Sequence, residues 1–245
     1  MFRFTTTGES HGRALVAIVE GLPAGLPIDI SLIDRELERR QWGYGRGGRM
    51  KIERDRVEVF SGLRHGLTLG SPVTLVIENK DWSNWTEVMA AEQLEAPPEK
   101  TRRVSRPVPA ADLAGGQKYD VRDLRNILER ASARETAARV ACGALARQLL
   151  AALGVEIKSH VIQLGGVPDA PLELAWEAVA SIPDDAPLRC ADPAAQERMV
   201  ALIDETRRAG DTLGGIFEVI ARGRRRDSAR TLRGIKSSTG GSRKP

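Results

Sequence analysis

Cysteine, histidine and long apolar runs are all scarce in this sequence of 245 residues. The two cysteines, Cys142 and Cys190, lie far apart, which excludes a disulfide framework and a cysteine-ligated zinc site. No stretch reaches the roughly 18–20 apolar residues of a membrane-spanning helix, and the N-terminus lacks the apolar core of a signal peptide. We therefore expect a cytoplasmic protein with no membrane partner and no metal, in which Cys142 packs inside the fold.

Acidic residues are not in excess, and the formal net charge is +4. The last 23 residues, 223–245, hold eight Lys or Arg and one Asp, which leaves 29 basic and 32 acidic residues in 1–222. Any binding of nucleic acid would thus be expected at the basic C-terminal tail, because residues 1–222 show little sign of a basic groove. Because this tail has almost no apolar residues, we expect it to be disordered.

Hydrophobic patterning predicts a mixture of strands and helices in residues 1–222. Helices are predicted at 29–41, capped by Ser31, and at 131–154, where Ser132 and Glu135 have capping-box spacing and Gly154 stands at the C-terminal end. A third helix is predicted at 194–210, and 81–126 is expected to be a long loop region with short pieces of structure. Strands are predicted at 2–6, 13–19, 57–62, 71–79, 155–166 and 214–223. Strands and helices do not alternate strictly, which favours an α+β fold over a doubly wound sheet.

The segment GESHG, residues 8–12, interrupts two predicted strands. Its glycines let a ligand approach the main chain closely, and His11 can exchange a proton near neutral pH. The alternative is a tight turn in which Ser10 and Glu9 satisfy backbone N–H groups. From the motif alone the two interpretations are about equally good.

Arginines and glycines alternate in RRQWGYGRGGRM, residues 39–50. Guanidinium groups bind phosphates and carboxylates through two parallel hydrogen bonds, and a glycine-rich main chain leaves room for such a ligand. The alternative is a solvated loop, although the interleaved Trp42 and Tyr44 indicate order.

A second cluster of polar residues lies in LERASARET, residues 128–136. Arg130, Ser132 and Arg134 stand near a predicted helix N-terminus, where free N–H groups and the helix dipole favour a phosphate or the edge of a flavin. An ordinary capping box followed by surface arginines is the alternative.

The other histidines and two tryptophans carry weaker signals. His65 and His160 have no partners at metal or triad spacing, so we expect structural roles. Trp82 and Trp85 could stack on a ligand, but such residues more often anchor a loop against the core.

Several of these segments, taken in order, resemble one enzyme family. GESHG followed by EGLPAGLP, then LERRQWGYGRGGRM, GSPVTLVIENKDW and LERASARETAARVACGALA, is similar to chorismate synthase. The resemblance covers about residues 1–222, the N-terminal half to two-thirds of the family's usual chain, and residues 223–245 are unrelated to it.

The resemblance implies a reaction, a cofactor and an assembly. The reaction is that of a lyase: 5-enolpyruvylshikimate 3-phosphate becomes chorismate with loss of phosphate, the last step of the shikimate pathway in aromatic amino-acid biosynthesis. Reduced FMN is required, and NADPH is the implied reductant. The family forms a cytoplasmic homotetramer, and its α+β fold is a β-α-β sandwich that would be incomplete in this chain.

The resemblance also implies roles for individual residues. His11 matches a histidine that donates a proton beside the reduced flavin, and Ser10 a residue close to the substrate. Arg130, Ala131 and Ser132 match an FMN-contacting segment. Arg40 and Arg46 match arginines assigned to nicotinamide dinucleotide phosphate or to substrate anions, and Arg49 and Arg134 resemble further ligands of substrate anions.

Two departures from the family pattern stand out. In RPVPAAD, residues 106–112, Val108 replaces an arginine and Ala110 replaces a Gly-His pair, so the second active-site histidine is missing. Loss of a transition-state donor or cation lowers a rate by ~10²-fold or more. The tail replaces a second half that carries more FMN contacts and a late Arg/Asp pair. The alternative hypothesis is therefore a truncated, inactive remnant that binds anionic ligands, or nucleic acid through its tail.

Overall fold

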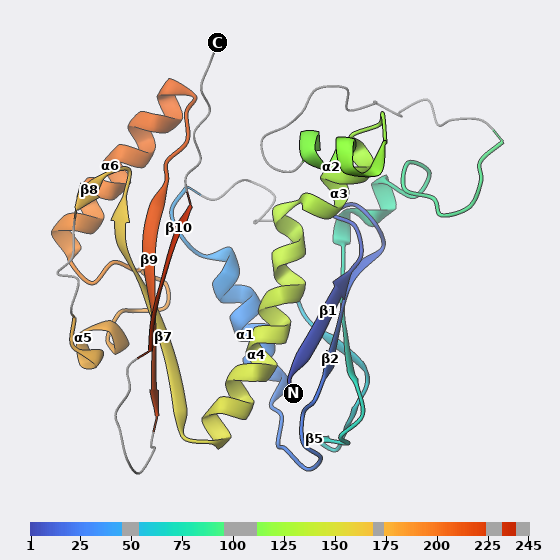
Figure 1. Cartoon of the computed structure of the whole chain (residues 1–245), viewed down its shortest axis with the longest axis horizontal. Helices are drawn as coiled ribbons and strands as arrows, with labels where there is room; N and C mark the ends of the chain where they lie inside the picture. Colours follow the sequence, from blue (N-terminus) through green and yellow to red (C-terminus); the bar gives the residue numbers. More distant parts are fainter. Residues whose placement is uncertain (46–53, 96–111, 169–173, 224–231, 239–245) are drawn as a thin grey trace. The chain divides into compact units, whose positions relative to one another are not determined.

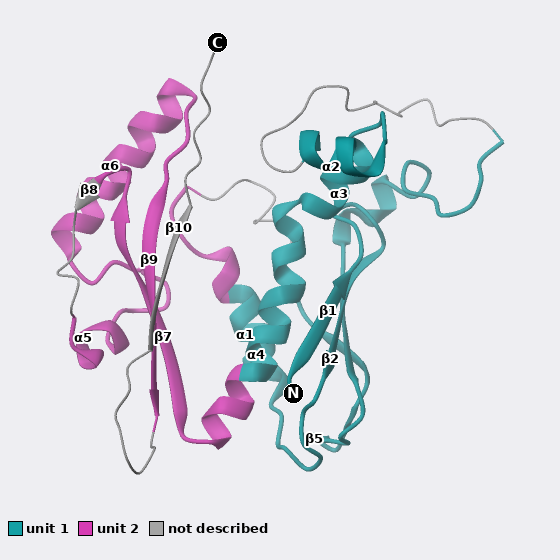
Figure 2. Ribbon diagram, in the orientation of Figure 1, with its two compact units in different colours: residues 1–38, 49–146 teal, residues 39–48, 147–245 magenta. Residues whose placement is uncertain are grey.

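The computed structural model describes residues 1–45, 54–95, 112–168, 174–223 and 232–238. Figure 2 shows the chain divided into two compact units. Unit 1 comprises residues 1–38 and 49–146, and unit 2 comprises 39–48 and 147–245. Each unit combines one four-stranded sheet with helices, which confirms the predicted α+β class. In the described parts of the chain, we find no helix with the length and apolar character needed to span a membrane.

Unit 1 is built on an antiparallel sheet of order β1-β2-β6-β3 (Figure 1). Its strands are β1 (Arg3–Thr7), β2 (Ala14–Glu20), β6 (Val73–Glu78) and β3 (Glu58–Ser61), close to the predicted bounds. Alternate residues of β2 and β6 are buried, as a sheet with one covered face requires: Leu15, Ala17, Val19, Val73, Leu75 and Ile77. A short hairpin, β4 (Leu63–Arg64) and β5 (Leu67–Thr68), completes the strands described in this unit.

The first helix, α1 (Ile30–Gln41), matches its prediction and buries Ile33 and Leu37 completely. Ser31 does not cap it. The Asp29 carboxylate accepts hydrogen bonds from the Ser31 N–H at 2.8 Å and the Ser31 hydroxyl at 2.6 Å. These bonds lower the pKa of Asp29. The acceptor at the helix N-terminus is therefore the Asp29 carboxylate, two residues before the predicted Ser31.

The predicted helix 131–154 is interrupted at its start. The chain leaves α3 (Arg125–Ala131) at Ser132, forms the short 3-10 helix η3 (Ala133–Glu135), and enters α4 (Thr136–Ala152). Ser132 accepts from the Arg134 N–H, whereas the Glu135 carboxylate accepts from Thr6 of β1, so the predicted capping box does not form. Gly154 follows the helix with a positive φ of 73°, as predicted.

The predicted loop region 81–126 does contain short elements. The 3-10 helix η2 (Lys80–Asn84) follows β6, and α2 (Asp112–Tyr119) precedes α3. Residues 96–111, which include Val108 and Ala110, lie outside the described residues.

Unit 2 holds a second antiparallel sheet, of order β10-β9-β7-β8. Its strands are β10 (Leu232–Ser238), β9 (Gly215–Gly223), β7 (Val155–Leu164) and β8 (Val167–Pro168). Helices α5 (Trp176–Ala180) and α6 (Pro193–Ala209) belong to the same unit. Residues Ala195 and Met199 of α6 are buried with Cys190, and Val161 and Leu164 of β7 pack against them.

The expectation of a disordered tail is wrong for residues 232–238. They form β10, which pairs with β9 from Leu232↔Ala221 to Ser238↔Gly215. The physical reason is the edge of β9, whose main-chain N–H and C=O groups accept a partner strand without requiring an apolar sequence. The other residues of the tail, 224–231 and 239–245, lie outside the described residues.

Candidate active site

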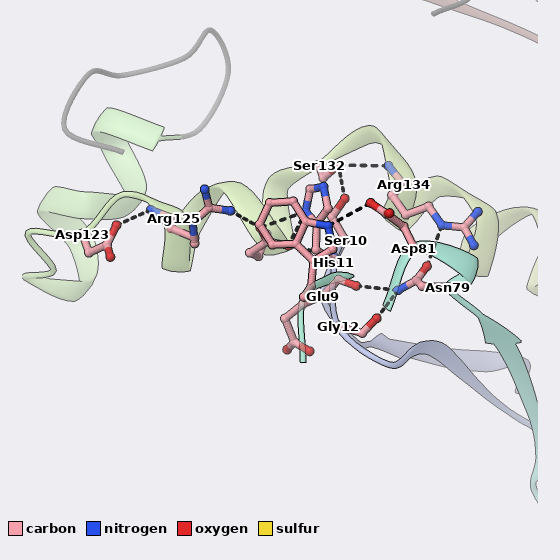
Figure 3. A network of polar contacts seen from close by, with 12 residues as sticks. Glu9, Ser10, His11, Gly12, Asn79, Asp81, Asp123, Arg125, Ser132 and Arg134 are labelled. Carbon is pink, nitrogen blue, oxygen red and sulfur yellow. Dashed lines mark hydrogen bonds and ion pairs between the residues drawn. The ribbon is translucent and has the colours of Figure 1, made fainter. Parts of the chain in front are cut away.

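The GESHG segment is a turn between β1 and β2, fixed by one buried amide. Asn79, at the end of β6, donates its side-chain N–H groups to the carbonyls of Glu9 at 3.0 Å and Gly12 at 2.7 Å. Figure 3 shows this amide between the two ends of the turn. Gly8 has a φ of 95°, and a Cβ there would lie 2.2 Å from the Ala14 carbonyl oxygen, so only glycine fits.

His11 faces a buried carboxylate from α3. Its Nδ1 lies 3.0 Å from both carboxylate oxygens of Glu129, and its main-chain N–H donates to Glu129 Oε2 at 2.8 Å. The main-chain N–H of Ser10 donates to the Glu129 carbonyl at 2.9 Å. The Glu129 side chain is 1% exposed and that of His11 is 21% exposed. Glu129 therefore binds both the ring and the main chain of the turn.

Aromatic and cationic groups complete the surroundings of this pair. The ring of Trp85 lies against His11, with centroids 4.1 Å apart and planes tilted by 39°. Arg125 places its guanidinium 5.1 Å from the centroid of Trp85 and donates to Glu129 Oε1 at 3.0 Å. Burial opposes ionisation of Glu129, but the hydrogen bonds from His11 and the charges of His11 and Arg125 outweigh it and lower the pKa of this carboxyl.

The segment between α3 and η3 also contacts the turn. Ser132 donates its hydroxyl to the Ser10 hydroxyl at 3.0 Å, and Ser10 is buried. Arg130 donates to the carbonyls of Thr6 at 2.6 Å and Gly8 at 3.3 Å. The structure thus brings together Ser10, His11, Arg130 and Ser132, and Ala131 ends α3 beside them.

Arg134 forms a buried ion pair near the end of β6. Its guanidinium binds both carboxylate oxygens of Asp55 at 2.6 Å and donates to Asn79 Oδ1 at 2.8 Å. The side chains of Arg134 and Asp55 are only 5% and 1% exposed. In the structure Arg134 supports Asn79, and Asn79 holds the turn. The predicted role of Arg134 as a ligand of a substrate anion stays a prediction.

Of the predicted ligands Arg40, Arg46 and Arg49, the structure describes Arg40 alone. Arg40 belongs to unit 2, in the last turn of α1. Arg46 and Arg49 lie outside the described residues. Their predicted roles therefore stay predictions.

His160, His65 and Cys142 have different surroundings from the Ser10–His11 turn. His160 is buried and pairs with Glu218 on the neighbouring strand, its Nε2 lying 3.0 Å from Glu218 Oε2. His65 is exposed, in the turn between β4 and β5, with a φ of 51°. Cys142 is buried in α4, and this burial raises the pKa of its thiol to about 11, in agreement with its expected packing role. Among the described residues, no group of His, Cys, Asp and Glu could hold a metal ion.

Sequence reasoning missed the residues that hold the turn: Glu129, Asn79, Asp55 and Arg125. The spacing of Arg125 and Glu129 is typical of a helical ion pair, and this is the one local signal that could have found Glu129. Nothing in the local sequence connects Glu129 with His11, because 118 positions separate them.

Comparisons with known proteins agree with the motif resemblance. The family model described as chorismate synthase matches residues 2–227. Chorismate synthase of Symbiobacterium thermophilum is 59% identical over 228 residues, and that of Enterococcus faecalis is 55% identical over 223 residues. Each alignment covers 90% of this chain and 58% of the relative.

A solved structure gives the same result. The crystal structure of a chorismate synthase superposes with a TM-score of 0.70 at 41% sequence identity, and the match covers 90% of this chain and 58% of that one. The chain thus spans a little over half the length of the relatives it matches. The chain belongs to the chorismate synthase family.

Proposed function

We propose that this protein converts 5-enolpyruvylshikimate 3-phosphate to chorismate and phosphate with the help of reduced FMN. The observation that carries the proposal is the turn of Ser10 and His11, bound through Glu129 and Ser132 to the very segment that matches the family's FMN-contacting residues. The reaction breaks one C–O bond to phosphate and removes one proton from carbon. It therefore needs groups that bind anions and a group that exchanges protons.

His11 supplies the proton-exchanging group in this proposal. It acts as the proton donor beside the flavin, and Ser10 lies close to the substrate. Because the Ser10 main chain and the His11 main chain are both bonded to Glu129, the two side chains keep a fixed relation to each other. A fixed donor lowers the entropy that must be lost before reaction.

Cationic residues would bind the charged substrate, which carries one phosphate and two carboxylates. We assign this role to Arg40, Arg46 and Arg49. Arg40 and Arg46 would also bind the phosphate of NADPH. Guanidinium groups suit these anions because their planar fork matches the geometry of carboxylate and phosphate oxygens.

The residues beside Arg130 fit a flavin mononucleotide. Arg130 and Ala131 line a groove of about 620 Å³ in unit 1, together with Ile127, Lys118 and Tyr119. This size is typical of small-molecule sites, and the lining offers an apolar wall, an aromatic ring and two cations for a planar ring system with one phosphate. When bound, reduced FMN supplies electrons that return to it within the turnover, so it is not consumed overall. Arg130, Ala131 and Ser132 would hold it.

The family resemblance also supports a cytoplasmic homotetramer. Size-exclusion chromatography with light scattering tests the assembly directly. A mass of about four chains is the expected result, because the family assembles in this way.

An anaerobic assay tests the function. The purified chain, given reduced FMN and 5-enolpyruvylshikimate 3-phosphate, should release phosphate and form chorismate in equal amounts. His11→Ala should lower the rate ~10²–10⁴-fold because it removes the proton donor. His65→Asn is the matched control, since His65 is exposed in a turn and asparagine tolerates its positive φ. Absence of chorismate with the unchanged chain, or full activity of His11→Ala, would contradict the proposal.

A further inference from the structure

We propose that Glu129 is a positioning residue that keeps the proton of neutral His11 on Nδ1, so that Nε2 is the nitrogen that exchanges protons with a ligand. The effect of Glu129 on turnover rests on the function proposed above, whereas the position of the proton on the His11 ring does not. The two claims can therefore be tested separately.

The first argument is the chemistry of the two partners. An ionised carboxylate accepts hydrogen bonds and cannot donate one, whereas a neutral imidazole has one donor and one acceptor nitrogen. Nδ1 of His11 lies 3.0 Å from each oxygen of Glu129, so it must be the donor when Glu129 is charged. Nε2, on the far side of the ring, is then the acceptor of the neutral form and a donor only after protonation.

The second argument concerns the charge of Glu129. Arg125 donates to Glu129 Oε1 at 3.0 Å, and the main-chain N–H of His11 donates to Oε2 at 2.8 Å. Burial raises the pKa of Glu129, but the hydrogen bonds from the ring and the main chain of His11, with the charges of His11 and Arg125, outweigh it and lower this pKa. Glu129 therefore faces Nδ1 as a charged acceptor.

The third argument is that the ring is held in its orientation. Trp85 covers the ring at a centroid distance of 4.1 Å, and its own indole N–H donates to Asp81 Oδ2 at 2.8 Å. Arg125 lies over the same indole ring, 5.1 Å from its centroid. Rotation of His11 away from Glu129 would have to displace Trp85, which is bonded in place. Tautomer and orientation are thus set by the same group of side chains.

Nitrogen NMR of the chain labelled with ¹⁵N-histidine measures the proposed state. At a pH where His11 is neutral, Nδ1 should have the chemical shift of a protonated nitrogen and Nε2 that of an unprotonated one. The signals of the three histidines are assigned with His11→Ala and His65→Asn. An unprotonated Nδ1 in the unchanged chain would overturn the inference without any variant at Glu129.

A pair of carboxylate variants then tests the cause. Glu129→Gln places a group that both donates and accepts opposite Nδ1, so the Nδ1 and Nε2 shifts should move toward each other. Glu135→Gln is the matched control, because Glu135 belongs to the same segment but accepts from Thr6 and Arg139. It should leave the His11 shifts unchanged. Equal shifts in Glu129→Gln and the unchanged chain would overturn the inference.

Turnover provides the second readout. In the anaerobic assay, Glu129→Gln should lower kcat by about 10–100-fold with little change in KM, as for other residues that orient a reacting histidine. An unchanged kcat would remove the catalytic consequence. If the unchanged chain forms no chorismate, the proposed function fails, while the nitrogen shifts still decide whether Glu129 sets the tautomer of His11.

Discussion

Single buried charges decide how the Ser10–His11 turn is held. Arg134 connects Asp55 with Asn79, and Asn79 in turn binds the carbonyls of Glu9 and Gly12. Asp55, Arg134 and Asn79 can therefore affect the turn without contacting a ligand. Their contribution to stability comes mainly from the cost of leaving a buried partner without its bond.

Asp55→Asn tests this at the scale of one residue. The change leaves the 5%-exposed guanidinium of Arg134 without its counter-charge, and we expect the free energy of unfolding to fall by about 3 kcal/mol. Glu177→Gln is the control, because the pair of Arg222 and Glu177 has side chains 59% and 74% exposed. That variant should leave the urea midpoint nearly unchanged, because water screens an exposed ion pair. Equal urea midpoints for the two variants would contradict the structural role of Arg134.

At the scale of elements, the stretch from α3 through η3 into α4 gathers most of the contacts of the site. Within it, Glu129 binds the turn, Arg130 binds β1, and Arg134 reaches the end of β6. The break at Ser132 separates α3 from the helical turn that follows, so these neighbouring residues are not restricted to one helix face. An unbroken helix would place residues 129, 130 and 134 at the fixed angles of its own surface.

The stability of this stretch should depend on acid. Burial disfavours the charged forms of Glu129 and Glu135, but hydrogen bonds from His11 and Thr6, together with nearby cations, lower both pKa values below the ordinary 4.5. Their stabilising contribution is therefore complete above the ordinary pKa and is lost as the pH falls below it. Urea unfolding between about pH 5 and pH 3 should show a decreasing free energy, with a shallower slope in Glu129→Gln. The same pH dependence of the unfolding free energy in the unchanged chain and in Glu129→Gln would contradict a stabilising role of ionised Glu129.

At the scale of the whole molecule, the chain forms two compact units, each with an antiparallel sheet of its own. The chain spans 58% of the length of its relatives, yet β10 comes from residues 232–238, beyond the family match that ends at residue 227. This strand covers one edge of β9 along seven residue pairs. An uncovered strand edge is a template for association with other chains.

Removal of β10 should therefore change self-association. A chain ending at Gly223 exposes the edge of β9 and should form larger species, detected by light scattering after size-exclusion chromatography. The control is a chain ending at Ser238, which keeps β10 and should elute like the unchanged protein. Identical elution of all three chains would show that β10 does not protect this edge.

Local patterns in the sequence were sufficient for most of the secondary structure. The alternation in β2 and β6 and the 3.6-residue period of α6 describe how each segment buries one face, which is a property of neighbouring residues. Gly154 and Gly210, both with positive φ, end helices where the pattern placed them. The family also followed from the sequence, since several motifs occur in a fixed order.

Only the tertiary structure decided the partners of the charged residues. Glu129 meets His11 across 118 positions, and Arg134 meets Asp55 across 79. Just after the break at Ser132, Glu135 accepts a hydrogen bond from Thr6 of β1, and β10 pairs with the edge of β9. Local periodicity records which residues are apolar, but a buried carboxylate or guanidinium pairs with whatever the fold brings within reach. For this reason the sequence alone determined the family and His11 as a candidate, whereas the fold determined what holds His11 in place.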